Sequence, residues 1–258
     1  MFSLIGTLVF AFMLALPFSQ ARADDSARYG DLPGDIATGV DLRVASADVW
    51  PWGYRTESGE LAGTLVTFYD RLSVLIGKTF HNVLRPHRRV IRELESGRVD
   101  LAVLYESPTT EQAGILVAPV IQVRVLLAGL ADSQLKLSLG GGLAGRTVAY
   151  IRGTYYGEAF EQDDSIRKVA VKDLRQAVEM LLRGRVDALV ASDQSFFSTL
   201  HEMGLGAERF RLSVALQQQD GALYLSRASS RDDLVPELRR AVETMRRNGD
   251  LAEIFHLP

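Results

Sequence analysis

The tetrapeptide Gly-Arg-Val-Asp occurs twice in this chain, at residues 97–100 and 184–187. Each copy follows a segment whose apolar residues recur at helical spacing and precedes a short apolar run. A glycine in this position can take the left-handed backbone conformation that ends many helices. The context therefore predicts the same helix, turn and strand at both places, although a match of four residues also arises by chance or in a generic turn.

The two copies lie too far apart for a solenoid, in which a repeat is ~20 to 50 residues long. They instead predict two similar α/β lobes in one chain. The length of 258 residues suffices for two lobes of about 100 to 130 residues, each with a core of its own. Because small ligands often bind between domains, the cleft between the lobes is the expected place for a site.

Strands and helices alternate in both halves of the chain. In the first half we expect strands at 42–47, 80–84 and 99–104, a helix from about residue 90, and a helix that ends at Gly77 and has one apolar face: Leu65, Phe68, Tyr69, Leu72, Leu75 and Ile76. The second half repeats this order with strands at 147–151, 169–171 and 186–190 and a helix at 174–182. Such alternation is typical of a largely parallel sheet that helices cover on both faces.

The connecting segments are less regular. Residues 115–130 form a long apolar stretch that we interpret as an extended crossover, and residues 133–145, rich in Gly, Ser and Leu, as a surface connection. A further strand is expected at 221–226. It is followed by a helix with one apolar face that ends near residues 248–249.

The amino-terminal residues indicate export. Residues 4–16 are nearly all apolar, Pro17 follows, and Ala21-Arg22-Ala23 fits an A-x-A cleavage site, so residues 1–23 are predicted to be a signal peptide. The apolar run is short for a membrane span, which favours cleavage. An uncleaved anchor remains an alternative because no Lys or Arg precedes the run. Residues 24–40, with three Gly and one Pro, read as a flexible lead-in.

Charge and composition exclude several classes of partner. Without residues 1–23, which hold one basic residue and no acidic one, 28 Lys and Arg face 32 Asp and Glu, a net charge of −4. Nucleic acid is therefore not an expected partner. The chain has no cysteine, and its four histidines show no ligand spacing, so we expect no disulfide, no metal and no cofactor. A soluble monomer in a bacterial periplasm fits best.

Several segments, in their order and spacing over about residues 41–257, resemble one known family. They are Leu42-Arg43-Val44, Trp50-Pro51-Trp52-Gly53-Tyr54, residues 94–101, residues 146–150 with Arg152-Gly153-Thr154, residues 185–188, and residues 247–255. The family is the bacterial extracellular solute-binding proteins of family 3, the substrate-binding type of polar amino acid ABC transporters. The resemblance implies a two-lobed, type II-like periplasmic binding protein fold, in which each lobe is a mainly parallel sheet flanked by helices.

The same resemblance implies the lobe boundaries. Residues 41–123 and 218–258 would form the first lobe, and residues 124–217 would supply two hinge strands and the second lobe. Lobes of this kind close on their ligand by hinge motion.

The resemblance also places aromatic residues against the ligand in the loop after the first strand, where Trp50 and Trp52 stand. An indole offers flat apolar area, an N–H donor and attraction for a cation. Alternatively, one of the two simply packs between this loop and the core. His87 falls where the family has another first-lobe contact, or it is an exposed residue at the start of a helix.

In the family, the loop after residues 101–104 binds a ligand carboxylate through hydroxyl groups, backbone N–H groups and an arginine. Tyr105 and Ser107 lie in this loop here, and Gln112 takes the place of the arginine. Glutamine replaces neither the charge nor the paired donors of a guanidinium.

The second lobe departs from the family as well. Ser192 stands where relatives have the aspartate that binds the ligand's ammonium group, and Asp193 comes one residue later. Arg152, Thr154 and Tyr155 lie in the loop that donates hydrogen bonds, where Arg152 either supplies a positive charge or is solvated at the rim. We therefore expect a small polar solute, with an anionic one as an open alternative, that is not a standard α-amino acid.

Three functions remain open from the sequence. In the first, the protein traps a solute between its lobes and presents it to an ABC permease or a sensor kinase. The second is a periplasmic dehydratase-like enzyme on the same fold, with Glu106 or His87 as the proton-transfer group. The third is a degenerate interaction protein that takes no part in transport and has lost closure.

Overall fold

The computed structural model describes residues 41–255, which all belong to one compact unit. The predictions for the signal peptide at 1–23 and the lead-in at 24–40 lie outside the described residues. Within the described part of the chain, no helix is long and apolar enough to cross a membrane.

Strands and helices follow one another much as the sequence predicts. The strands are β1 (Leu42–Ala47), β2 (Tyr54–Arg55), β3 (Leu61–Ala62), β4 (Phe80–Arg85), β5 (Leu101–Tyr105), β6 (Gly114–Leu130), β7 (Thr147–Ile151), β8 (Arg167–Val171), β9 (Ala188–Ser192) and β10 (Phe210–Ser226). The α-helices are α1 (Thr64–Ile76), α2 (His87–Glu95), α3 (Pro108–Ala113), α4 (Glu158–Glu161), α5 (Leu174–Leu182), α6 (Asp193–Glu202), α7 (Val235–Arg247) and α8 (Asp250–Phe255). Two short 3-10 turns are Ala207–Arg209 and Asp232–Leu234.

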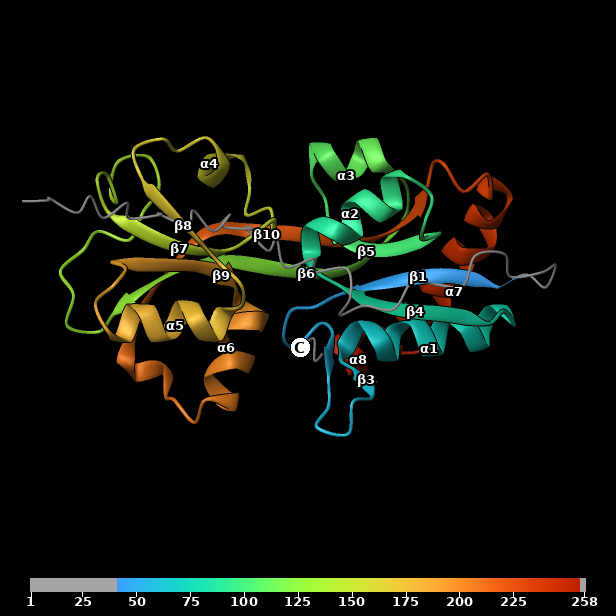
Figure 1. The fold of residues 1–258 in the computed structure, drawn as a ribbon, viewed down its shortest axis with the longest axis horizontal. Coiled ribbons are helices and arrows are strands. Elements are labelled where there is room, and N and C mark those ends of the chain that lie inside the picture. Colours follow the sequence, from blue (N-terminus) through green and yellow to red (C-terminus); the bar gives the residue numbers. More distant parts are fainter. Residues whose placement is uncertain (1–40, 256–258) are drawn as a thin grey trace, which may run out of the picture. The chain divides into compact units, whose positions relative to one another are not determined.

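The described strands form one eight-stranded mixed sheet with the order β4-β1-β5-β10-β6-β9-β7-β8, and β2 pairs with β3 in a separate hairpin. In one half of the large sheet, β1 runs parallel to β4 and β5; in the other half, β7 runs parallel to β8 and β9. The long strands β6 and β10 are antiparallel to each other and join the halves (Figure 1). This confirms the predicted α/β fold, with a mainly parallel sheet in each half and two connecting strands.

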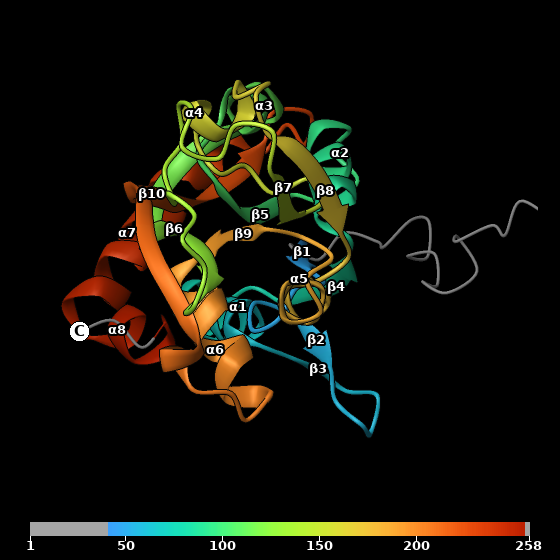
Figure 2. The ribbon, with the colours of Figure 1, turned by 90° about the vertical axis from the view of Figure 1, so that its left-hand side faces the viewer.

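Helices cover both faces of the sheet. In both views α2, α3 and α4 lie on one side, and α1, α5 and α6 lie on the other (Figures 1 and 2). We call β1, α1, β4, α2 and β5 the first βαβαβ unit, and β7, α4, β8, α5 and β9 the second. The two units share the same strand order, with the first strand of each in the middle.

The two Gly-Arg-Val-Asp segments adopt the same turn. Gly97 has φ 71° and Gly184 has φ 65°, both in the left-handed region. The next residue donates its backbone N–H back across the helix end: Arg98 to the carbonyl of Glu93 at 2.9 Å, and Arg185 to the carbonyl of Met180 at 2.9 Å. This six-residue closure is the Schellman arrangement that glycine permits at a helix end.

The aspartates of the repeat tie the third strand of each unit to the first. The Asp100 N–H donates to the Arg43 carbonyl at 2.7 Å, and the Arg43 N–H donates to Asp100 Oδ2 at 2.8 Å. The Asp187 N–H donates to the Thr147 carbonyl at 2.8 Å, and the Thr147 N–H donates to Asp187 Oδ2 at 2.7 Å. The tetrapeptide is therefore a repeated structural device and not a chance match.

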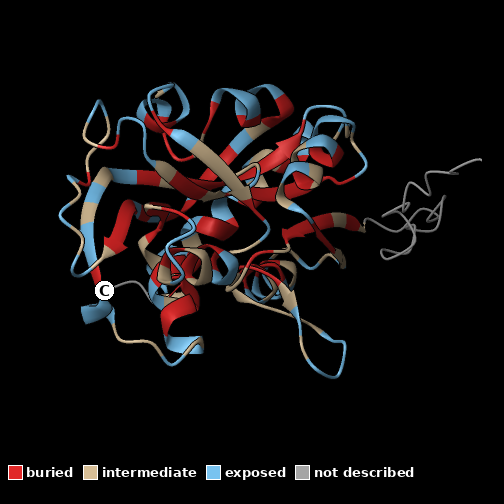
Figure 3. Cartoon of the chain, turned by 60° about the vertical axis from the view of Figure 1, so that its left-hand side comes forward, coloured by how far each residue is buried: buried red, intermediate tan, exposed pale blue. Residues whose placement is uncertain are grey.

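Buried residues follow the strands and the helix faces that cover them (Figure 3). On α1 the predicted apolar face is buried at Leu65, Phe68, Tyr69 and Leu72, but Leu75 is 41% exposed, so that part of the prediction is wrong. In the second unit, a separate apolar cluster forms around Phe160 and extends into the connection at 133–145. That connection has no helix or strand, yet its Leu137 and Leu143 are buried in this cluster.

The sequence did not lead us to expect the β2–β3 hairpin, α3, α4, α6 or the first half of β10. The segment expected as a loop after β5 contains α3, which begins with Ser107 as its cap and Pro108 in its first turn. Helix α6 follows β9 without a break. Strand β10 starts at Phe210 and not at 221. Its first half was missed because these residues are a mixture of polar and apolar types with little burial.

Candidate functional site

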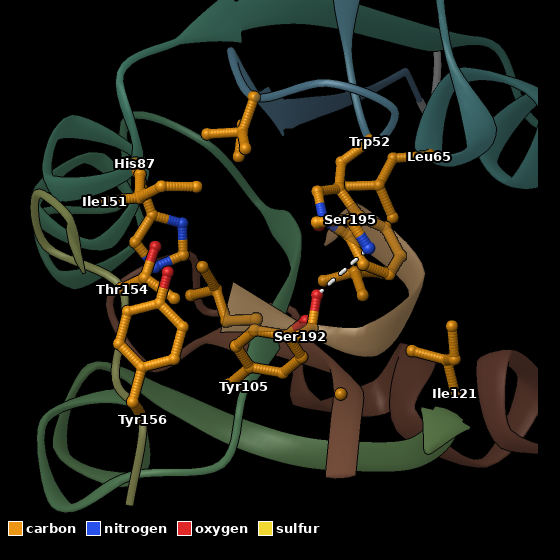
Figure 4. A pocket seen from close by; sticks show the side chains of 15 residues that line it. Trp52, Leu65, His87, Tyr105, Ile121, Ile151, Thr154, Tyr156, Ser192 and Ser195 are labelled. Atoms are coloured by element: carbon orange, nitrogen blue, oxygen red, sulfur yellow. Dashed lines mark hydrogen bonds between the residues drawn. The ribbon is translucent and has the colours of Figure 1, made fainter. Parts of the chain in front are cut away.

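A small cavity lies where the two βαβαβ units meet β6 and β10. Its volume is about 50 Å³. We call it the central cavity, and its lining residues are Ala47, Val49, Trp52, Leu65, His87, Val103, Leu104, Tyr105, Ile121, Ile151, Thr154, Tyr156, Ser192, Ser195 and Gly221. Figure 4 shows His87, Thr154 and Tyr156 on one side of it and Trp52, Leu65 and Ser195 on the other, with Tyr105 and Ser192 between. The cavity thus brings together five residues predicted from the sequence: Trp52, His87, Tyr105, Thr154 and Ser192.

Trp52 connects the loop after β1 to helix α6. Its indole Nε1–H donates to Ser195 Oγ at 2.9 Å, and the bond is buried (Figure 4). The ring also meets Tyr105 edge-on, with centroids 6.3 Å apart and planes at 87°. Trp52 is only 9% exposed and belongs to the main apolar cluster. Trp52 therefore packs in the core, one of the two roles considered from the sequence, and also lines the cavity where a ligand contact was expected.

Two tyrosine hydroxyls reach the cavity from opposite units. Burial raises the pKa of Tyr105, and the neighbouring Ser192 hydroxyl acts in the opposite direction. Burial also raises the pKa of Tyr156. Both phenols are therefore neutral hydrogen-bonding groups at physiological pH. The Tyr105 hydroxyl is buried without a well-aligned hydrogen-bond partner among the described residues.

His87 is the first residue of α2, directly after Pro86. Burial lowers the pKa of His87 to about 4, although the residue keeps partial exposure at the edge of the cavity. The imidazole is therefore neutral at physiological pH, where it offers one donor and one acceptor and no charge.

Charged side chains are absent from the lining of the central cavity among the residues that the structure describes. Asp193 lies outside it, where its Oδ2 accepts from Arg124 Nε at 2.8 Å. Gln112 is exposed on α3 and does not line the cavity. Gln112 and Asp193, which stand at or next to the positions of the family's charged ligand contacts, therefore do not line the cavity with Ser192 and Tyr105.

A second depression, which we call the outer groove, adjoins the cavity and shares His87, Tyr105 and Thr154 with it. Its volume is about 390 Å³. Three more of the predicted residues line it: Ser107, Arg152 and Tyr155. Its charged lining residues are Arg88, Arg92, Glu95, Arg152 and Glu161. Arg152 is exposed there, which agrees with the alternative that it is solvated at the rim. The Ser107 hydroxyl caps α3 by accepting from the Thr110 N–H at 3.2 Å.

Trp50 occupies a third place, away from the central cavity. It stacks at a tilt on Tyr54, with ring centroids 4.5 Å apart, and lines a groove of about 960 Å³ with Phe197 and His201 of α6. Its indole N–H is buried without a partner among the described residues.

Glu106, the carboxylate considered for catalysis, does not line the central cavity. Its pKa is raised by partial burial and by the negative charges of Asp220 and Glu111. Within residues 41–255, no group of three or more His, Cys, Asp or Glu side chains is placed to hold a metal ion.

Two cavity residues were missed from the sequence, Tyr156 and Ser195. Tyr156 follows Tyr155 directly, and the chain turns so that Tyr156 is 2% exposed while Tyr155 faces the outer groove. Ser195 is reached only because α6 begins at the end of β9, where Ser192 as the cap and Asp193 in the first turn are signals that could have indicated the helix.

Many solved structures match this fold, and the three that follow do so at low sequence identity. An ancestral arginine-binding protein bound to arginine matches with a TM-score of 0.71 and 16% identity, over 84% of this chain and 96% of the other. A histidine kinase sensor domain similar to periplasmic binding proteins matches with a TM-score of 0.71 and 19% identity, over 83% and 94%. The substrate-binding protein of an amino acid ABC transporter matches with a TM-score of 0.68 and 17% identity, over 83% and 96%.

These likenesses establish a periplasmic binding protein fold, as the sequence predicted. No protein-family model matches the sequence, and no curated protein does.

Proposed function

We propose that the protein is a periplasmic solute-binding protein that traps a small polar solute in the central cavity. One observation carries this proposal: residues from both βαβαβ units and from both connecting strands enclose a single cavity. Sites between two lobes are where proteins of this architecture bind ligands. The fold of the similar structures, which include binding proteins and a sensor domain, supports the same function.

The proposal includes two lobes that open and close. Residues 41–123 and 218–258 form the first lobe, and residues 124–217 form the hinge strands and the second. The pairing of β6 with β10 is irregular between Val214 and Gln219, where the register shifts twice. Interrupted ladder pairing weakens a strand pair locally, so this region is the proposed hinge.

The solute is proposed not to be a standard α-amino acid. An α-amino acid carries an ammonium and a carboxylate group, and each must find a partner when it leaves water. The charged residues that the sequence placed near these groups, Arg152 and Asp193, lie in the outer groove and in an ion pair with Arg124. The proposed partner of the closed form is an ABC permease or a sensor kinase, and the protein acts as a monomer.

We propose binding without chemistry. A dehydratase-like reaction would need an acid or base at the solute, and Glu106 does not line the cavity. His87 does line it, as a neutral imidazole that can hydrogen-bond to a solute.

A thermal-shift screen of residues 24–258 against amino acids, carboxylates, polyamines, aromatic acids and neutral solutes tests the proposal. A solute at ~100 times its dissociation constant stabilises the folded state by about 2.7 kcal/mol, which is roughly 5–10 °C for a protein of this size. Ser192→Ala should reduce the shift, because Ser192 lines the cavity, and Gln112→Ala should keep it, because Gln112 is exposed on α3. A screen without any shift, or a shift that only Gln112→Ala removes, would contradict the proposed site.

A further inference from the structure

The chemistry of the central cavity restricts the charge of any solute it can hold. Among the described residues, its lining consists of aliphatic and aromatic side chains, serine and threonine hydroxyls, two phenols and one imidazole. Since burial keeps Tyr105, Tyr156 and His87 neutral, none of them provides a counter-charge at physiological pH. An ion in this space would lose its hydration without an opposite charge to replace it, which is strongly unfavourable.

Charges outside the cavity do not change this conclusion. Arg88, Arg92 and Arg152 are exposed in the outer groove, where Glu95 and Glu161 also lie. Their fields are screened by water and partly cancelled by the two carboxylates. The negative charge of Asp193 on α6 does act on Tyr105, whose pKa it helps to raise, but Asp193 is paired with Arg124 at 2.8 Å and does not line the cavity.

The hydrogen-bonding groups of the cavity define which polar atom a solute should present. The Trp52 N–H is already used by Ser195, at 2.9 Å. The Tyr105 hydroxyl lies beside the Ser192 hydroxyl but has no well-aligned partner among the described residues, so it is able to donate to an acceptor of the solute. Val103, Leu104 and Ile151 of the lining offer only apolar contact beside it.

The size of the cavity limits the solute as well. A buried water needs roughly 10–15 Å³ of such volume, so about 50 Å³ accommodates only a few water-sized groups. At the best efficiency seen for very small ligands, a solute of about four non-hydrogen atoms binds no more tightly than ~0.05 mM.

We propose that the central cavity selects a compact, uncharged solute with an oxygen acceptor, of the class of short amides, alcohols and ketones, and that this acceptor binds the Tyr105 hydroxyl. The inference rests on the proposed solute-binding function and names the ligand class of that same site. It excludes carboxylates, ammonium compounds and zwitterionic amino acids as occupants of the central cavity.

The test compares solutes that share a skeleton and differ in charge. The chain has two tryptophans, so Trp50→Phe leaves Trp52 as the single indole and as a reporter inside the cavity. Acetamide with acetate, and propionamide with propionate, are titrated to ~50 mM at constant ionic strength while the fluorescence of Trp52 is recorded. Saturable changes with the amides are expected, at least tenfold weaker or absent with the carboxylates.

Two further variants locate the contact. In the same background, Tyr105→Phe should weaken amide binding about tenfold, the effect expected from one lost hydrogen bond at a buried acceptor. Tyr155→Phe removes a phenol from the outer groove and should leave binding unchanged. Equal effects of the two variants would contradict the proposed contact.

The outcomes separate this inference from the proposed function. Carboxylates that bind as well as their amides would overturn the uncharged class and leave the solute trap standing. If neither the amides nor the carboxylates change the fluorescence, the inference is overturned for solutes of this size. If the thermal-shift screen also gives no shift, the proposed function itself is overturned.

Discussion

Replacing each aspartate of the repeated tetrapeptide with alanine should destabilise the protein unequally. The Asp100 side chain is 2% exposed and accepts from the Arg43 N–H at 2.8 Å, Nε at 3.2 Å and Nη2 at 3.1 Å. The Asp187 side chain is 33% exposed and accepts from the Thr147 N–H at 2.7 Å, and its ion pair with Arg146 is loose, at 3.7 Å. The two sites therefore share a turn but differ in access to water.

The expected magnitudes follow from this difference. Asp100→Ala leaves a buried backbone N–H without an acceptor, which costs about 1–3 kcal/mol, and removes an Arg43 ion pair that is partly exposed and adds roughly 1 kcal/mol. Asp187→Ala leaves the Thr147 N–H free to bond with water, so the free energy of unfolding should fall by only about 1 kcal/mol. We expect losses of about 3 and 1 kcal/mol, which correspond to roughly 6–12 °C and 2–4 °C in melting temperature.

Thermal unfolding followed by far-ultraviolet circular dichroism measures both variants. Asp100→Asn is the matched control, because it keeps an acceptor for the Arg43 N–H and removes the charge, and its loss should lie between the wild type and Asp100→Ala. Equal losses at positions 100 and 187, or a larger loss at 187, would refute the argument from burial.

Three further predictions concern the groups around the cavity. Burial lowers the pKa of His87 to about 4, from ~6.5 in an unfolded chain, so the unfolded state binds more protons between these pH values. The contribution of His87 to stability is therefore complete above pH ~6.5, and about 3 kcal/mol is lost as the pH falls to ~4. Urea titrations across this range should show the loss in the wild type and not in His87→Gln. Tyr69→Phe should cost about 2 kcal/mol by urea denaturation, because the Tyr69 hydroxyl accepts from the Val103 N–H at 2.8 Å and donates to the Ala45 carbonyl at 3.2 Å; a loss near zero would contradict this. Gly153→Ala should lower the melting temperature more than Gly59→Ala, since both glycines have similar positive φ, 87° and 86°, but only at 153 would a Cβ overlap the Arg88 side chain; equal shifts would show that this contact is unimportant.

Periodicity in the sequence was sufficient to predict most of the fold. The apolar face of α1 and the glycine after it marked one helix, and the helix at 174–182 agrees with α5 at both ends. These signals are strong because burial of one helix face and the left-handed glycine are local requirements of the chain. The early part of β10 was missed because strand pairing with β6, and not a local pattern, holds those residues extended.

The candidate site could be predicted only in part. Tyr105 and Ser192 are the last residues of β5 and β9, and Trp52 lies in the loop after β1, so the order of elements was enough to bring them together. The burial of Tyr156 depends on which way the backbone turns after β7, which a sequence does not specify. The positions of Asp193 and Arg152 depend on side-chain partners formed only in the folded chain.

The position of a bound solute shows whether the central cavity is the binding site. Nuclear Overhauser contacts can be measured between the protons of the solute with the largest thermal shift and the aromatic rings of the labelled protein. The account predicts contacts to Trp52 and Tyr156, which line the central cavity from the two units. Contacts to Tyr155 of the outer groove alone would contradict it.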